Sequence, residues 1–329
     1  MFAKEIEFES ERFLHKLYGE NPKNLRLVED VLNVSLLARG GSLCMEGDAD
    51  ALGRCEEFFE LLRTGREQGF TTRNGDFSQI LGKVAEGKAG EFRELFADPL
   101  VLNLRKTSVV PRNLAQKRYL RKILRDDMVI SIGPAGTGKT FLAMTVALHS
   151  LLQGEVEKIV LARPAVEAGE ALGFLPGDLE EKLLPYLRPL YDAMDETLGP
   201  LEARKLVESG VVEIAPLAYM RGRTLSKCFA LLDEAQNATS AQVKMFLTRL
   251  GEGSKMVVTG DVTQIDLPRS KDSGLVEAEK ILEGLKGVSF HHFDEEDVVR
   301  HPMVTEIIRA YDNHPDRKRR GEDRTEEES

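Results

Sequence analysis

Residues 133–140 carry the clearest chemical pattern in this 329-residue chain. They read Gly133, Pro134, Ala135, Gly136, Thr137, Gly138, Lys139 and Thr140, which fits the phosphate-binding pattern G-x-x-x-x-G-K-[ST] at every position. The glycines let the backbone curl so that successive N–H groups point at an anion, and a following helix adds the positive end of its dipole. Lys139 can reach the β- and γ-phosphates, and the Thr140 hydroxyl can hold Mg²⁺. The loop predicts binding of a nucleoside triphosphate together with Mg²⁺.

Two adjacent carboxylates, Asp233 and Glu234, follow the apolar run 229–232. A buried parallel strand presents such acids at its carboxyl end, where the phosphate loop of the same sheet also lies. We therefore expect Asp233 to hold the Mg²⁺ shell and Glu234 to orient and activate the water that attacks the γ-phosphate. A base at this position favours a hydrolase over the alternative of a P-loop kinase acting on a small molecule or an RNA end.

Two glutamines extend the predicted site. Gln264 ends the segment 259–264, which follows an apolar strand, and its amide can donate to the γ-phosphate or to the attacking water. Gln116 ends the segment 111–116, ahead of a helix expected at 117–124, and both ends of its amide can bind the adenine edge. Each has a structural alternative: a surface side chain after a capped turn for Gln264, and a capping or surface role for Gln116. The functional interpretation makes ATP the nucleotide and Gln264 the sensor of its γ-phosphate.

Apolar strand-like runs alternate with helical segments from residue 107 to residue 312. This order predicts an α/β fold with a parallel sheet covered by helices on both faces. Together with the phosphate loop, it resembles the RecA-like sheet of the P-loop NTPases. The expected strands are 128–132, 158–162, 211–215, 229–232, 255–259 and 288–292. The expected helices are 139–153, 178–198, 200–209, 239–250, 273–284 and 296–312. Pro185 and Pro189 should kink or split the longest of these helices.

A small α+β domain is expected over residues 1–70, with a helix at 24–33, a strand pair at 34–39 and 42–46, and a helix at 49–68. This order resembles a reduced KH-like RNA-binding module. The G-x-x-G loop of KH domains is missing, however, and Gly19-Glu20-Asn21-Pro22 is the nearest stretch. A structural or docking domain is the alternative. A linker with short helices at 71–106, the P-loop domain at 107–312 and a disordered charged tail at 313–329 complete the predicted organisation.

Composition restricts the class of protein. The net charge of −10 argues against a nucleic-acid binder that works through overall basicity. The sequence has no apolar run long enough to span a membrane and no signal-peptide core, so a cytoplasmic protein without a membrane partner is expected. Three scattered cysteines fit a reducing compartment. His291, His292 and His301 lack the carboxylate or cysteine pattern of a metal site, and structural roles are favoured for them.

Four segments together resemble the PhoH-like ATPases, a family related to the motor core of superfamily 1 helicases. They are residues 133–140, the run Asp233-Glu234-Ala235-Gln236-Asn237, residues 259–266 and residues 162–170. The resemblance covers about residues 107–312, and the N-terminal module also looks like that of the longer bacterial branch. It implies ATP binding and hydrolysis in the cytoplasm and a role in RNA metabolism. It also implies Gln116 as the adenine reader, Gln264 as the γ-phosphate sensor and an rRNA-maturation endoribonuclease as a candidate partner.

One departure from the helicases concerns the positive charge that the γ-phosphoryl transition state needs. Helicases supply arginines from a second motor domain, for which this chain has no room. Arg300 is the first candidate for this catalytic role, and the further candidates are Arg163, Arg221, Arg223 and Arg269, for each of which a structural or surface role is the alternative. Supply from a neighbouring subunit is the other option. It predicts a homo-oligomeric ring, of which a hexamer is one form, with sites shared between subunits.

A basic loop at 219–224, Tyr219-Met220-Arg221-Gly222-Arg223-Thr224, is a candidate RNA contact, with Lys227 close by. Arginines can grip a phosphate backbone, and the glycine lets the loop fit against it. An ordinary exposed loop is the alternative. The sequence as a whole favours a Mg²⁺-dependent ATPase coupled to RNA binding or remodelling. The alternative is a nucleotide-controlled scaffold that docks an RNA-processing partner and hydrolyses ATP slowly.

Overall fold

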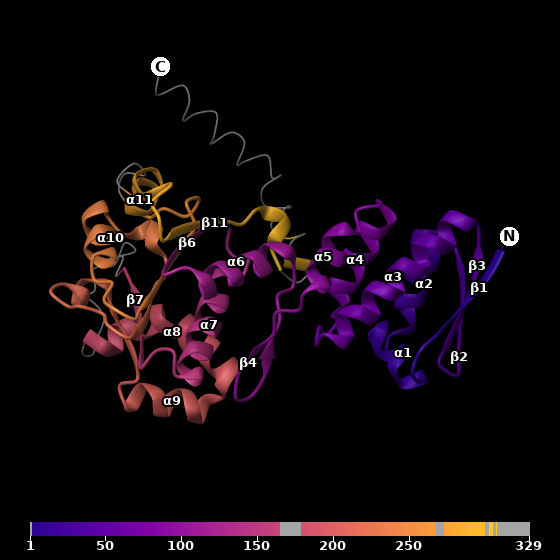
Figure 1. Ribbon diagram of the computed structural model, residues 1–329, viewed down its shortest axis with the longest axis horizontal. Coiled ribbons are helices and arrows are strands. Elements are labelled where there is room, and N and C mark those ends of the chain that lie inside the picture. Colours follow the sequence, from indigo (N-terminus) through magenta and orange to yellow (C-terminus); the bar gives the residue numbers. More distant parts are fainter. Residues whose placement is uncertain (1, 165–178, 268–272, 300–302, 305–306, 308–329) are drawn as a thin grey trace, which may run out of the picture. The chain divides into compact units, whose positions relative to one another are not determined.

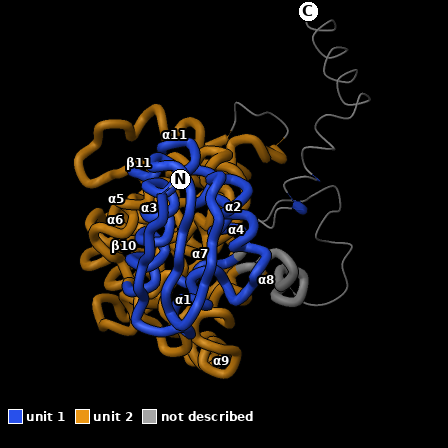
Figure 2. The backbone as a smooth tube through the Cα atoms, turned by 90° about the vertical axis from the view of Figure 1, so that its right-hand side faces the viewer, with its two compact units in different colours: residues 1–67, 71–90, 299–329 blue, residues 68–70, 91–298 orange. Residues whose placement is uncertain are grey.

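The computed structural model describes residues 2–164, 179–267, 273–299, 303, 304 and 307. It divides the chain into two compact units, coloured separately in Figure 2. Unit 1 holds residues 2–67 and 71–90 and the described residues after Val298, and unit 2 holds Gln68–Phe70 and Glu91–Val298. Arg269, Arg300, the end of the 162–170 motif and the predicted tail at 313–329 lie outside the described residues.

A six-stranded parallel sheet forms the centre of unit 2 (Figure 1). Its strands are β6 (Met128–Ile132), β7 (Lys158–Arg163), β8 (Val212–Pro216), β9 (Cys228–Leu232), β10 (Lys255–Gly260) and β11 (Val288–His292). They lie in the order β11-β6-β10-β9-β7-β8, and every described pairing between them is parallel. β6 and β9 are buried at every residue, because helices cover both faces. The predicted α/β class is confirmed, and each predicted strand lies within about one residue of the observed one.

Helices cover the sheet in two layers. They are α6 (Leu114–Arg125), α7 (Lys139–Gln153), α8 (Leu179–Leu198), α9 (Pro200–Glu208), α10 (Ser240–Leu247) and α11 (Gly274–Leu282). Apolar residues of α6 to α9 share one core with alternate strand residues such as Val129 and Leu231. Residues of α10 and α11 share the other core with Ile130 and Leu232, because successive strand residues point to opposite faces.

One predicted helix start needs correction, and the longest helix is continuous. α8 is not split, because a single helix continues through Pro185 and Pro189. α6 begins at Leu114, so that Gln116 lies in its first turn and not ahead of it. The reason is Asn113, whose side chain accepts a hydrogen bond from the Gln116 N–H (2.8 Å) and caps the helix.

Unit 1 contains a three-stranded antiparallel sheet in the order β1-β3-β2. Its elements are β1 (Phe2–Glu7), α1 (Glu11–Leu17), α2 (Pro22–Leu32), β2 (Ser35–Arg39), β3 (Ser42–Gly47), α3 (Ala49–Glu67) and α4 (Asn74–Ala85). No helix or strand was expected before residue 24, so β1 and α1 were not predicted. β1 carries little signal in the sequence because Ile6 is its one buried residue, and pairing with β3 holds it in place.

The turn between α1 and α2 contains Gly19-Glu20-Asn21-Pro22, the stretch that comes nearest to a G-x-x-G loop. Gly19 N–H donates to the Lys16 carbonyl, and Lys23 N–H donates to the Asn21 side chain (3.1 Å). Amides that cap their own helices do not point at an incoming phosphate. RNA binding by this module stays a prediction.

The region expected to be a linker contains α4, α5 (Gly90–Ala97) and β4 (Leu102–Asn103), and β4 pairs with β5 (Ser108–Val109), which follows it. The structure groups residues 71–90 with unit 1 and Glu91–Val298 with unit 2. α4 joins unit 1 because Phe77 packs edge-on against Phe58 of α3, with their ring centroids 4.9 Å apart. Among the described residues, no helix combines the length and the apolar character needed to cross a bilayer.

Candidate active site at the carboxyl ends of the strands

The phosphate loop connects β6 to α7. Gly136 and Gly138 have positive φ angles of 89° and 87°, which suit glycine. A Cβ atom at Gly133 would lie 2.6 Å from the Phe293 carbonyl oxygen, so the chain after β11 approaches too closely for any side chain there. Lys139 Nζ donates to the carbonyls of Gly133 (2.6 Å) and Pro134 (2.8 Å), and these contacts hold the ammonium inside the loop.

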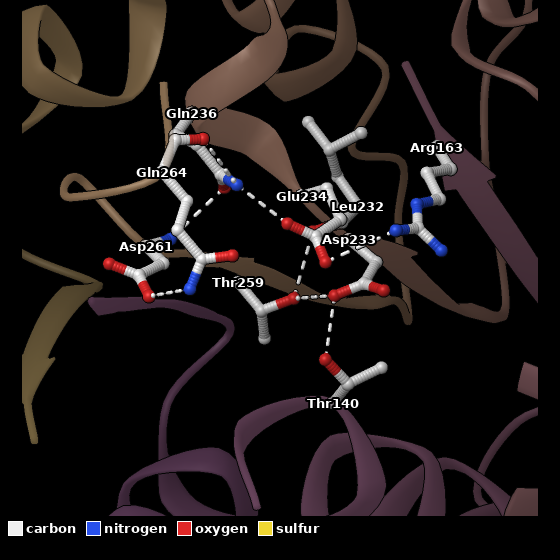
Figure 3. A network of polar contacts seen from close by, with 9 residues as sticks. All are labelled: Thr140, Arg163, Leu232, Asp233, Glu234, Gln236, Thr259, Asp261 and Gln264. Carbon is white, nitrogen blue, oxygen red and sulfur yellow. Dashed lines mark hydrogen bonds and ion pairs between the residues drawn. The ribbon is translucent and has the colours of Figure 1, made fainter. Parts of the chain in front are cut away.

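Asp233 lies directly across from the first turn of α7. Its Oδ1 accepts hydrogen bonds from the Thr140 hydroxyl (2.6 Å) and the Thr259 hydroxyl (2.7 Å), as Figure 3 shows. Asp233 is 4% exposed, and its N–H donates to the Ala162 carbonyl, which ties the end of β9 to β7. The two predicted Mg²⁺ ligands, Thr140 and Asp233, therefore meet although 93 residues separate them.

Glu234 has the left-handed backbone conformation (φ 55°, ψ 39°), which is uncommon for a residue other than glycine. This turn directs its carboxylate toward two partners (Figure 3). Arg163, the last residue of β7, contacts Oε1 at 3.1 Å, and the Gln236 amide donates to Oε2 at 2.6 Å. A strained conformation held by surrounding contacts is frequent at functional sites.

The segment after β10 lies beside the phosphate loop. Asp261 is 4% exposed, and its Oδ2 accepts from the Ala135 N–H (3.1 Å) and from the Gln264 amide (2.7 Å). Its Oδ1 accepts from the N–H and the hydroxyl of Thr263. The carboxylate thus holds Gln264 next to the loop.

A pocket of about 260 Å³ connects these groups. It is lined by Ala135, Gly136, Gly138, Lys139, Thr140, Phe141, Asp233, Glu234, Gly260, Asp261 and Gln264. Gln116 is not among them. Its amide donates to the Thr137 carbonyl (2.9 Å) and accepts from the Arg112 N–H (2.8 Å), so both ends are bonded to backbone. In this arrangement Gln116 braces the loop, and reading adenine would require an exchange of these bonds.

The arginines predicted as catalytic candidates have different surroundings. Arg163 contacts Glu234, whereas Arg223 makes two hydrogen bonds to Glu213 (2.5 and 2.8 Å). These hydrogen bonds, aided by Lys158, lower the pKa of Glu213 to about 2 against the opposing effect of burial. Arg223 is therefore engaged in the structure of its loop, and Arg221 is exposed.

The neighbouring histidines of β11 differ in environment. His291 is 6% exposed and lies between the rings of Tyr119 and Phe293, whereas His292 is exposed and contacts Glu279 (2.6 Å). Burial, with smaller effects of nearby cations, lowers the pKa of His291 to about 4. Within the described ranges, no group of three or more histidine, cysteine or acidic side chains could hold a metal ion.

Three contributors to the site were not predicted: Thr259 on Asp233, Gln236 on Glu234, and Arg163 as the counter-ion of Glu234. The role of Gln236 could have been predicted, because it stands two residues after Glu234 in a polar run that follows a buried strand. Thr259 and Arg163 stand in the segments 259–266 and 162–170 that carry the family resemblance, but only the sheet order brings them to the acids.

Comparisons with known proteins identify the family of this chain. A family model described as "PhoH-like protein" matches residues 108–312. This chain belongs to the PhoH-like family. The "PhoH-like protein" of Bacillus subtilis (strain 168) is 46% identical over 296 residues, which cover 90% of this chain and 93% of that protein. "Protein PhoH" of Escherichia coli (strain K12) is 38% identical, over 79% of this chain and 78% of its own.

A large terminase from a thermophilic bacteriophage is among the similar solved structures, with 15% identity and a TM-score of 0.37. The match covers 59% of this chain and 49% of the terminase. The fold, the phosphate loop and the family together are those of a nucleotide-binding P-loop ATPase.

Proposed function

We propose that this PhoH-like protein hydrolyses ATP with Mg²⁺ and uses the reaction in RNA metabolism. The observation that carries the proposal is the hydrogen bond between Thr140 of the phosphate loop and Asp233, with Glu234 as the next residue. It joins the group that would hold the polyphosphate to the acids that would serve hydrolysis.

In this proposal, Lys139 and the N–H groups of residues 136–140 bind the β- and γ-phosphates. Lys139 exchanges its bonds to the Gly133 and Pro134 carbonyls for phosphate oxygens when ATP enters. Glu234 accepts the proton of the attacking water at one of its carboxylate oxygens. Gln264, held on Asp261 at the pocket wall, donates to the γ-phosphate or to that water.

The residues present fit a Mg²⁺ ion. Thr140 and Asp233 offer a hydroxyl and a carboxylate oxygen, the hard donors that Mg²⁺ prefers, and two such ligands beside phosphate oxygens are its usual setting in ATPases. When bound, the ion would neutralise charge that develops on the phosphate oxygens. The Thr259 hydroxyl donates to the same Asp233 oxygen and so holds the carboxylate in place for this task.

Glu234→Gln tests the proposal. The variant keeps the side-chain shape and removes the base, so turnover should fall about 10²- to 10⁴-fold. Binding of a fluorescent ATP analogue should stay within about threefold, because Glu234 is not a predicted phosphate ligand. Glu208→Gln, at an exposed position at the end of α9, is the matched control and should behave as the wild type. Unchanged turnover in Glu234→Gln would overturn the assignment.

The same assay on the wild type tests the predicted ring. None of the candidate arginines in the described part of the chain lines the pocket, so we propose that a neighbouring subunit or Arg300 supplies the transition-state cation. Turnover per chain should rise with protein concentration if the subunits share sites. A monomer with full, concentration-independent turnover would exclude sharing.

The RNA part of the proposal rests on the loop after β8. Tyr219 is 55% exposed and Arg221 is exposed, with Gly222 at a φ of 77° between Arg221 and Arg223. An aromatic face beside a cation suits single-stranded RNA, whose bases stack and whose phosphates attract arginine. The loop follows the carboxyl end of an edge strand, on the same side of the sheet as the phosphate loop. An endoribonuclease partner and a cytoplasmic location stay predictions.

A switch with slow hydrolysis is the second candidate. It is favoured by the contacts of Glu234, because both carboxylate oxygens already have partners. With a switch, Glu234→Gln should remain locked in its active assembly with ATP bound. With a motor, the same variant should trap ATP and lose all work on RNA.

A further inference from the structure

The Gln236 side chain contacts several elements of the proposed active site, and the proposed function gives it no role. It lies in η3 (Ala235–Asn237), the short turn after β9, and is 1% exposed. Its amide nitrogen donates to Glu234 Oε2 (2.6 Å) and to the Gln264 carbonyl (3.3 Å). Its amide oxygen accepts from the Asp261 N–H (3.0 Å). One side chain therefore joins the predicted base to both ends of the segment 261–264.

The packing around Gln236 leaves it little freedom. Its backbone carbonyl accepts from the Ser273 hydroxyl (2.9 Å) at the start of α11. On the other side lies Gly260, where a Cβ atom would come within 2.9 Å of the Gln236 amide oxygen and 2.4 Å of Leu275. A fully buried amide with its donor and acceptor both used transmits displacement better than an exposed one, because the neighbouring atoms are close-packed.

The segment 261–264 is in turn connected to the phosphate loop. Asp261 Oδ2 accepts from the Ala135 N–H and from the Gln264 amide, so a γ-phosphate that attracts Gln264 or Ala135 pulls on this segment. Gln236 is the described side chain that carries such a movement on to Glu234, since it contacts both. Arg163 holds the other carboxylate oxygen of Glu234 and comes from a different strand.

We propose that Gln236 is a positioning residue that links the Gln264 segment to Glu234, so that engagement of the γ-phosphate sets the orientation of the base. The inference rests on the proposed function, in which Glu234 activates water. Gln236 itself does not line the pocket. Its contribution is the geometry of the carboxylate, and misplacement of a catalytic group by about 1 Å can cost about 100-fold in rate.

Gln236→Met is the first test, because methionine has a similar length and no amide. We expect kcat to fall about 10- to 100-fold, with the KM for ATP and the affinity for a fluorescent ATP analogue within about threefold of wild type. Gln242→Met is the matched control. Gln242 caps α10 through Thr239, away from the pocket, and its loss should lower the melting temperature with kcat unchanged.

A double variant tests the link itself. If Gln236 transmits the signal of Gln264, then Gln236→Met should slow a Gln264→Met enzyme by less than about threefold, well below its effect on the wild type. If the two single effects multiply in the double variant, the two residues act independently and the proposal is overturned.

Gln236→Glu is a further test variant, for use if Gln236→Met does not fold. It preserves shape and the acceptor for the Asp261 N–H, and it replaces the donor to Glu234 with a second carboxylate. Loss of the donor releases the Glu234 carboxylate, so kcat should fall about 10-fold or more while the KM for ATP stays within about threefold of wild type. Wild-type kcat in Gln236→Glu would overturn the proposal.

The outcomes separate the two claims. Equal turnover in wild type and Glu234→Gln removes the proposed base, and the inference about Gln236 with it. Slow turnover in Glu234→Gln together with wild-type kcat in Gln236→Met removes the inference alone.

Discussion

Acid should destabilise this protein well above the pH at which its carboxylates titrate, and His291 should be the cause. The ring is buried between Tyr119 (5.2 Å between centroids) and Phe293 (4.5 Å), and burial lowers its pKa from 6.5 to about 4. Lys122, His292 and Arg118 add repulsion toward a charged imidazole. The perturbation that tests this is His291→Asn, a neutral side chain that does not titrate.

The sign follows from which state binds the proton. Between pH 6.5 and pH 4 the unfolded chain protonates this histidine and the folded chain does not, so stability falls as the pH falls. One pKa unit corresponds to about 1.4 kcal/mol, so wild type should lose about 1 kcal/mol between pH 7.5 and 5.5 and about 3 kcal/mol by pH 4. His291→Asn should lose much less over the same range, whatever its stability at neutral pH.

Urea unfolding of the full chain at pH 7.5 and 5.5 measures the difference. Far-ultraviolet circular dichroism is the suitable signal, because the sequence contains no tryptophan. His292→Gln removes the exposed neighbour and is the matched control, which should retain the acid sensitivity of wild type. An equal loss of stability in wild type and His291→Asn would refute the reasoning and assign the effect to another group.

Two further predictions concern the phosphate loop and the basic loop. Gly133→Ala should cost about 2–3 kcal/mol and weaken ATP binding, because the added Cβ meets the Phe293 backbone, which cannot turn aside. Gly154→Ala, with a positive φ but nothing within 4 Å, should cost only about 1 kcal/mol and keep ATP affinity; equal effects would contradict the packing argument. Arg221→Glu should abolish RNA-stimulated turnover, whereas Arg204→Glu on α9 should retain it. Arg223 is unsuitable for this test because its loss would also release Glu213, and persistent stimulation in Arg221→Glu would remove the RNA contact.

Local sequence patterns were sufficient to predict the strands of the sheet and the residues at which they end. Buried parallel strands must be apolar along their whole length, so β6 and β9 were recognisable without a partner. The phosphate loop was recognisable because its glycines and Lys139 serve one anion within eight consecutive residues. The meeting of Thr140 with Asp233 also followed, because parallel strands bring their carboxyl ends to one edge.

Neither β1 nor the contacts of Gln116 could be predicted from the sequence, and the reason is the same for both. β1 has one buried residue and exists through its pairing with β3, and Gln116 is bonded to Thr137, 21 residues away. Such elements depend on partners that no local periodicity specifies.

The chain by itself determined which residues could bind a triphosphate and which acids could act on it, because those properties reside in side-chain chemistry and short-range spacing. Tertiary structure decided what each of these groups contacts. Arg163 and Glu234 are 71 residues apart and meet only because β7 and β9 are neighbours in the sheet. Gln236 reaches Gln264 only because Gly260 lets β10 and η3 approach within side-chain contact.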